Sequence, residues 1–199
     1  MRTLNRNASL AIGAALLMGA CTSSPLREPA GELPTAAPVA LDDYLQVLQT
    51  VNIAVGGQSL PFLFDTAGGA TLLTPTVADA IGCEPFGRVT GFRHDGNRID
   101  MPRCSPVDLH LGSVPLRAEA GVFDLMALLP QGAPKLGGMV SLQTLGARPW
   151  TLDLSSRTLT LETPTSLKQR TANMREIQVR PSTQGGGAGF DLFMKIDAP

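Results

Sequence analysis

The sequence FLFDTAGGATLL, residues 62–73, places a carboxylate, Asp65, between two short apolar runs. Runs this short and apolar are typical of buried strands, and the small residues Thr66 to Gly69 between them predict a turn. A carboxyl group held at the end of a buried strand is a candidate general acid or base. The plainer interpretation is an aspartate that only caps its own turn, which is common.

The residues on both sides of this stretch predict β structure and one short helix. Residues 46–55 (QVLQTVNIAV) alternate between apolar and polar residues, and the Gly-Gly turn at 56–57 leads into residues 60–64, so we expect a hairpin. After residue 73, Thr74-Pro75 predicts a helix over 75–81 with Thr74 as N-cap and Gly82 as its end.

Further along the chain, short strands continue. A hairpin is expected over 89–101 around Asp95-Gly96, a strong turn signal. Strands are expected at 71–73, 107–111 and 116–123, a short helix at 139–145, and a terminal hairpin from 150–154 and 158–162. Many short strands with frequent turns predict an all-β fold of the barrel or sandwich type.

The order of these features over residues 50–162 resembles one lobe of the aspartic protease family, in its retropepsin-like bacterial branch. Asp65-Thr66-Ala67-Gly68 is similar to the active-site turn of that family, and residues 89–101 are similar to its flap hairpin. Leu136-Gly137-Gly138 is similar to the element that packs behind the catalytic loop. The resemblance implies a closed β-barrel lobe with one or two short helices, spanning residues 43–163.

The resemblance also implies roles for particular residues. Asp65 would be the catalytic carboxylate, Thr66 would hydrogen-bond toward a second lobe, and Gly68, with Gly69, would let the chain turn tightly. The flap over a peptide substrate would include Gly91, Phe92, His94, Asp95 and Gly96. Catalysis by this family needs two aspartates that share one proton, of which the ionised one activates water.

Two positions depart from the family pattern. Ala67 stands where the family has glycine, and Gly137 stands where a larger apolar residue is usual, which predicts weaker packing behind the loop. No second Asp-Thr or Asp-Ser occurs in the 199 residues. The second aspartate would come from a homodimer partner or from a second lobe, whose beginning we expect in residues 164–199. A catalytically inactive, peptide-binding protein on the same fold is the alternative.

The N-terminus predicts export. Two arginines, an apolar run at 10–20 (LAIGAALLMGA) and then Cys21 are typical of a secretory signal, and the run is too short to span a bilayer. Cys21 directly after Gly19-Ala20 resembles a bacterial lipoprotein signal, against the alternatives of an ordinary cleaved signal or an uncleaved anchor. That resemblance implies a signal peptide at 1–20, a lipid on Cys21, a tether over 21–42, and a location at the outer membrane facing the periplasm.

Composition and cysteine count narrow the possible classes of protein further. The chain has 43% hydrophobic residues, 17% charged residues and a net charge of −1, which argues against a disordered chain and provides no overall basic charge for binding nucleic acid. Cys83 and Cys104 form an even pair that can oxidise in the periplasm, with two free thiols as the alternative. His94 and His110 lack metal-ligand spacing, so no metal or cofactor is expected.

Overall fold

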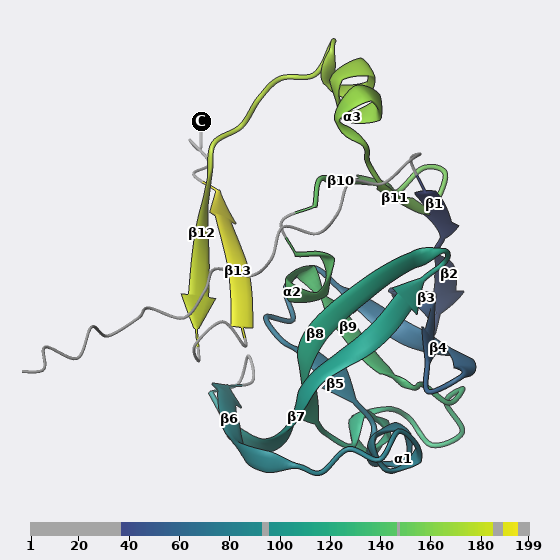
Figure 1. The fold of residues 1–199 in the computed structure, drawn as a ribbon, viewed down its shortest axis with the longest axis vertical. Coiled ribbons are helices and arrows are strands. Elements are labelled where there is room, and N and C mark those ends of the chain that lie inside the picture. The colour runs from purple at the N-terminus through teal and green to yellow at the C-terminus, as the bar shows by residue number, and fades with distance from the viewer. Residues whose placement is uncertain (1–36, 93–95, 147, 185–188, 195–199) are drawn as a thin grey trace, which may run out of the picture.

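In a computed structural model that describes residues 37–92, 96–146, 148–184 and 189–194, the protein is built mainly of β-strands (Figure 1). This confirms the all-β prediction. The strands are β1 (Ala37–Ala40), β2 (Asp42–Tyr44), β3 (Leu48–Val55), β4 (Gln58–Asp65), β5 (Thr71–Leu73), β6 (Phe86–Phe92), β7 (Arg98–Leu111), β8 (Val114–Val122), β9 (Gly138–Ser141), β10 (Trp150–Asp153), β11 (Thr158–Leu161), β12 (Val179–Gln184) and β13 (Gly189–Met194). The helices are α1 (Pro75–Ala80), α2 (Leu142–Leu145) and α3 (Pro164–Thr171), with a 3-10 turn, η1, at Leu125–Leu128.

One eight-stranded sheet dominates the structure. Its strand order is β2-β3-β4-β9-β5-β8-β7-β6, and β3 also pairs with β7, so the sheet curls around its own core. The core contains the fully buried side chains of Ile53, Phe62 and Leu109 together with Leu159 of a second sheet, β1-β11-β10. A fourteen-residue strand, β7, spans what the sequence suggested were two strands.

The centre of the large sheet is β9, which runs parallel to β4 and antiparallel to β5. All four of its residues are buried, and we predicted a helix here. That prediction was wrong for residues 139–141, because a short apolar run that is buried on both faces shows no strand alternation. Only residues 142–145 form the helix α2.

The ring of Phe62 packs against two glycines that precede and begin β9. A Cβ atom on Gly137 would lie 2.5 Å from the ring, and one on Gly138 would lie 2.1 Å from the carbonyl oxygen of Leu72. The expected weakness at Gly137 is therefore wrong, since Phe62, which has no exposed surface, already fills that space. A larger residue at 137 would displace the ring.

Two other expectations need correction. The tether was expected to reach residue 42, but residues 37–40 pair with β11 and residues 42–44 pair with β3, so the folded part begins earlier. Thr74 precedes α1 as predicted, yet its hydroxyl makes no cap hydrogen bond and donates instead to the carbonyl of Gly137, at 3.1 Å. Gly82 ends the helix with a φ of 68°, as its residue type suggests.

Residues beyond the second sheet form a helix and a hairpin. α3 begins with a capping box between Thr163 and Ser166, and β12 pairs with β13 in a two-stranded sheet beside the main body (Figure 1). Whether these elements begin a second lobe stays a prediction. The expected signal peptide and Cys21 lie outside the described residues. Among the described residues, no helix is long and apolar enough to cross a membrane.

Candidate active site

Asp65 is the last residue of β4, and the loop that follows it returns the chain into the same sheet as β5. Residues 65–70 are called here the Asp65 loop. Asp65 itself is partly exposed, and its Oδ1 accepts a hydrogen bond of 2.8 Å from the backbone N–H of Ala67. The other oxygen, Oδ2, has no hydrogen-bond partner among the described residues.

Each small residue of the Asp65 loop fits its position for a different structural reason. Gly69 adopts a φ of 64°, the left-handed conformation that favours glycine. A Cβ on Gly68 would crowd two side chains, since it would lie 3.0 Å from the carboxyl carbon of Asp65 and 2.8 Å from Cε of Met139. Ala67 is exposed and has no positive φ, so its methyl group fits the turn within one copy of the chain.

Strand β9, which lies behind the Asp65 loop, fixes the position of the first residue of the loop. Asp65 lies opposite Ser141 in the parallel register of β4 and β9, and Gly138 lies opposite both Phe62 and Leu73. Leu136, which precedes these glycines, is buried. The segment Leu136-Gly137-Gly138 thus packs directly behind the candidate carboxylate.

A β-hairpin of β6 and β7 rises beside the loop. Thr90 pairs with Asp100 across the hairpin, and the Thr90 hydroxyl donates to the Asp100 carboxylate at 2.6 Å. Hydrogen bonds from Thr90 and then Arg98 lower the pKa of Asp100, which favours its charged form. Gly91 and Phe92 are the last residues of β6, and the Phe92 side chain is 71% exposed.

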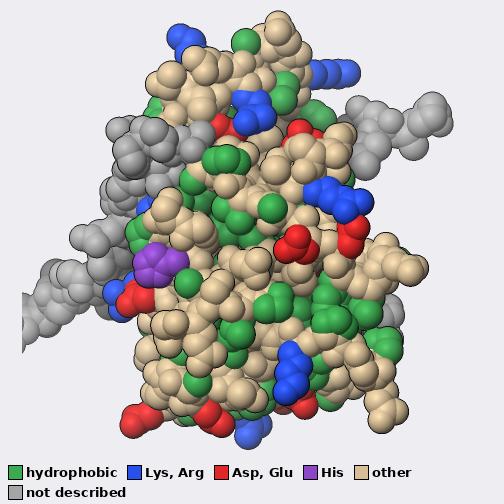
Figure 2. Space-filling model, turned by 90° about the vertical axis from the view of Figure 1, so that its right-hand side faces the viewer, with side chains coloured by type: hydrophobic (Ala, Val, Ile, Leu, Met, Phe, Trp, Pro, Cys, Tyr) green, Lys and Arg blue, Asp and Glu red, His purple; other side chains and the backbone are tan. Residues whose placement is uncertain are grey.

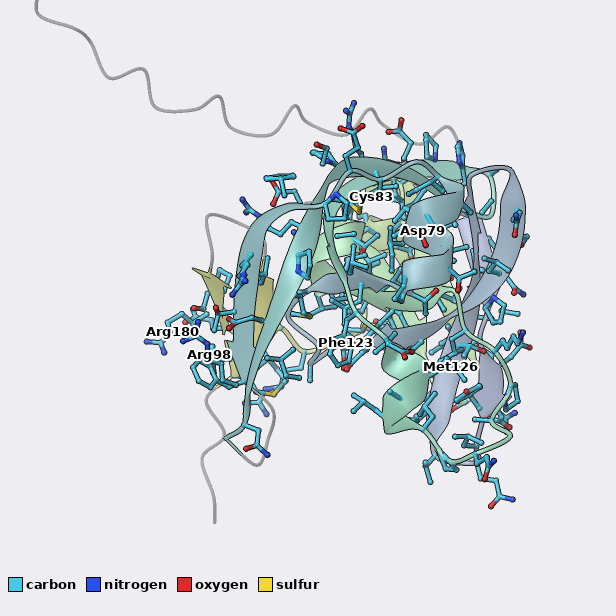
Figure 3. The ribbon with its side chains drawn as sticks, turned by 90° about the horizontal axis from the view of Figure 1, so that it is seen from below. Asp79, Cys83, Arg98, Phe123, Met126 and Arg180 are labelled. Carbon is cyan, nitrogen blue, oxygen red and sulfur yellow. A yellow bond between two sulfur atoms is a disulfide. The ribbon has the colours of Figure 1, made fainter. Side chains whose placement is uncertain are left out.

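The structure describes only some of the other residues that were predicted for this hairpin. Gly96 has a φ of 81° in the turn, as an Asp-Gly turn requires. His94 and Asp95 lie outside the described residues. Figure 3 shows Arg98 of this hairpin on one side of the molecule and Cys83, beyond α1, on another.

An apolar cluster joins the hairpin to the Asp65 loop, and sequence reasoning missed it. Its buried members are Leu72, Met101, Leu125 and Met139, with the partly buried Leu63, Ala70, Val89, Ile99 and Phe123 packed against them. The available signal was weak: Val89 and Gly91, like Ile99 and Met101, alternate along the hairpin strands and so share a face. Phe123, which precedes η1, and Met126, which lies within it, are both labelled in Figure 3.

Cys83 and Cys104 are joined by a disulfide. It connects the segment after α1 to β7, and both cysteines line an open hollow of about 450 Å³. The hollow does not include any residue of the Asp65 loop. It is therefore separate from the candidate active site.

The charged side chains form no field of one sign on the face that Figure 2 shows, where acidic and basic groups alternate. An ion pair joins Arg157, between β10 and β11, to Asp43 of β2. His110 is exposed on β7, consistent with its place in an alternating strand.

Comparison with known proteins gives limited likeness. No protein-family model matches the chain, and no curated protein matches it. Among solved structures, a retropepsin-like aspartic protease from Rickettsia conorii shares 13% identity over 63% of this chain and 88% of that one, with a TM-score of 0.41. An aspartic proteinase from Irpex lacteus shares 16% identity over 82% of this chain and 49% of that one, with a TM-score of 0.34.

Proposed function

We propose that this chain is an aspartic-type endopeptidase of the cell envelope, in which Asp65 works with the Asp65 of a second copy. The observation that carries the proposal is the Asp65 carboxylate. It stands at the end of a central strand with one oxygen held by Ala67 N–H and the other without a described partner. An apolar cluster includes Ala70 of the loop together with Val89, Ile99 and Met101 of the β6–β7 hairpin.

The chemistry follows from two carboxylates brought close together. Both cannot be ionised at about 3 Å, so they share one proton. The ionised carboxylate removes a proton from water as the water oxygen attacks the peptide carbonyl carbon. The protonated carboxyl gives its proton to the carbonyl oxygen. Collapse of the resulting gem-diol breaks the C–N bond as the amine nitrogen takes up a proton.

The residues around Asp65 fit a peptide substrate. The half-buried side chains of Val89, Ile99 and Phe123 offer apolar surface in the cluster that also includes Ala70 of the Asp65 loop. The hairpin that carries Gly91 and Phe92 would lie along the substrate backbone, and Thr66, which is exposed, would face the second copy. No cofactor or metal takes part in the proposed reaction.

The proposed location rests on the N-terminal sequence. Lipid on Cys21 would attach the protein to the outer membrane on its periplasmic side, and residues 22–36 would be the tether that remains before β1. A disulfide between Cys83 and Cys104 is consistent with an oxidising compartment.

The test is peptide cleavage by the chain from Thr22 onward, which keeps every described strand. Cleavage of a mixed peptide library is measured between about pH 3 and pH 7, the range in which carboxyl pairs titrate. Asp65→Asn should abolish cleavage, and Asp124→Asn, which changes an exposed aspartate that caps η1, should retain it. Equal cleavage by wild type and Asp65→Asn would refute the proposal.

The second candidate function is peptide binding without cleavage, favoured by one observation. The exposed methyl group of Ala67 adjoins the candidate carboxylate, where a second loop would have to approach closely. Absence of cleavage with retained, Asp65-independent peptide binding would favour this function. An Ala67→Gly variant that gains cleavage would show that the methyl group is the obstacle.

A further inference from the structure

Three hydroxyl groups are buried behind the Asp65 loop. Thr71, Ser141 and Thr144 have exposed fractions of 0%, 1% and 1%. The Thr71 hydroxyl hydrogen-bonds that of Thr144 and lies 3.4 Å from that of Ser141. These side chains come from β5, from the end of β9 and from α2, which are far apart in the sequence.

A fourth buried polar side chain lies next to these three hydroxyl groups. The amide oxygen of Gln143, also buried, accepts a hydrogen bond of 3.4 Å from the backbone N–H of Thr71. A buried hydroxyl without a partner is costly, so the members of such a cluster hold one another in a single arrangement. Valine in place of any of these threonines would keep the shape and lose the hydrogen bond.

The cluster touches both ends of the Asp65 loop. Ser141 is the register partner of Asp65, where the loop begins, and Thr71 is the first residue after the loop ends. Between these ends, the described backbone hydrogen bonds of the loop are few: Ala67 N–H to Asp65, and Ala70 N–H to Gly68 at 2.6 Å. The loop thus depends on how its ends are held.

We propose that the buried hydroxyl cluster of Thr71, Ser141 and Thr144 positions the Asp65 loop and thereby the candidate carboxylate. These are positioning residues, since none of them reaches the exposed side of the loop. The consequence for cleavage rests on the function proposed above, whereas the effect on the loop does not.

The test measures amide hydrogen exchange in the full chain, at Ala67 and Ala70. Thr144→Val should speed exchange at these two amides by about tenfold relative to the amides of β11, because the loop opens more often without its anchor. Thr144→Ser keeps the hydroxyl and should restore the wild-type rates. Ser141→Ala removes a single hydroxyl with little change in volume, and should speed exchange at the same two amides if Thr144→Val does not fold.

The matched control is Thr160→Val, the same change at a buried threonine of β11 in the other sheet. It should leave exchange at Ala67 and Ala70 unchanged relative to other amides. The proposal is overturned if Thr144→Val alters these two amides no more than Thr160→Val does, or if Thr144→Ser behaves like Thr144→Val.

A cleavage assay separates this proposal from the proposed function. If the chain cleaves peptides, Thr144→Val should lower kcat with KM little changed, and Thr144→Ser should recover kcat. If the wild-type chain cleaves nothing, the endopeptidase proposal fails while the exchange rates still decide whether the cluster holds the loop.

Discussion

Gly138 is the residue at which the candidate active site and the core meet. It pairs with Phe62 of β4 on one side and with Leu73 of β5 on the other, and the Phe62 ring covers it. Any side chain at this position would have to enter space that backbone and ring already occupy. The requirement is steric, since the φ of Gly138 is not positive.

We therefore expect Gly138→Ala to destabilise the fold by about 3 kcal/mol or more, since its Cβ would lie 2.1 Å from a backbone oxygen that cannot move away. Urea denaturation followed by circular dichroism measures the loss. Gly91→Ala is the control, because its Cβ would meet only Met101, at an ordinary 3.8 Å. Equal stability of the two variants would contradict the close packing described.

Glu162 is a second residue whose buried surroundings determine its contribution to stability. Its side chain is fully buried after β11, where the Arg170 Nε lies 2.5 Å from one carboxylate oxygen and the Ser166 hydroxyl donates to the other. Burial alone would raise the pKa of Glu162, but hydrogen bonds from Ser166, Thr151 and Arg170 together lower it below its ordinary value.

This lowered pKa predicts a pH dependence. Glu162 contributes stability above the unfolded-state pKa of about 4.3, and that contribution is lost as pH falls through the lower folded-state pKa. Glu162→Gln should cost about 2 kcal/mol at neutral pH and much less in acid. Unfolding free energies at neutral pH and near pH 3 test this, with the exposed Glu176→Gln as control. A loss that is the same at both pH values would argue against the charged interaction.

At the scale of elements, the disulfide links the segment after α1, which lies downstream of the Asp65 loop, to β7 of the β6–β7 hairpin. α1 follows β5 directly, and β7 is the strand that continues into the β6–β7 hairpin. Cys104 is buried on β7, and Cys83 lies after α1, 21 residues away in the sequence. The bond closes this stretch of chain at the base of the hairpin.

Replacing both cysteines by serine should lower the unfolding free energy by about 3 kcal/mol, the chain-entropy value for a loop of this length. Adding a dithiol reductant should lower the stability of the wild type by a similar amount and leave the double variant unchanged. Denaturation curves with and without reductant provide the comparison. A reductant effect of the same size on the double variant would mean that another site is responsible.

At the scale of the whole molecule, one copy of the described chain presents one carboxylate in an Asp-Thr turn. The proposed reaction needs two, and in the function proposed above the second comes from a second copy. The β12–β13 hairpin stands beside the main body (Figure 1), and three consecutive residues of β13, Leu192, Phe193 and Met194, have exposed fractions of 40–57%. Such exposed apolar side chains are common where another molecule packs.

Mixing wild-type chains with Asp65→Asn chains tests this requirement. If each active site takes one Asp65 from each copy, total cleavage should fall with the square of the wild-type fraction as Asp65→Asn is added at constant total protein. The mixture is re-equilibrated by dilution before each assay, and its mass is followed by sedimentation. A fall in simple proportion to the wild-type fraction would place both catalytic groups within one copy.

The sequence alone determined the features that depend on neighbours along the chain. Alternation predicted β3, the small-residue stretch predicted the turn after Asp65, and Gly82 and Gly96 marked positions that adopt positive φ. These are local because backbone preference and turn chemistry act over a few residues. The all-β fold class could be read at this level, whereas the candidate carboxylate depended on the order of features over residues 50–162.

Only the tertiary structure decided what depends on distant partners. β9 is a strand because β4 and β5 hydrogen-bond to both its edges. Residues 37–40 and 42–44 are strands because β11 and β3 pair with them. The Thr71–Thr144 hydrogen bond joins residues 73 positions apart, and the space at Gly137 is filled by Phe62. No local pattern records these contacts, because close packing selects them only when the whole sheet has formed.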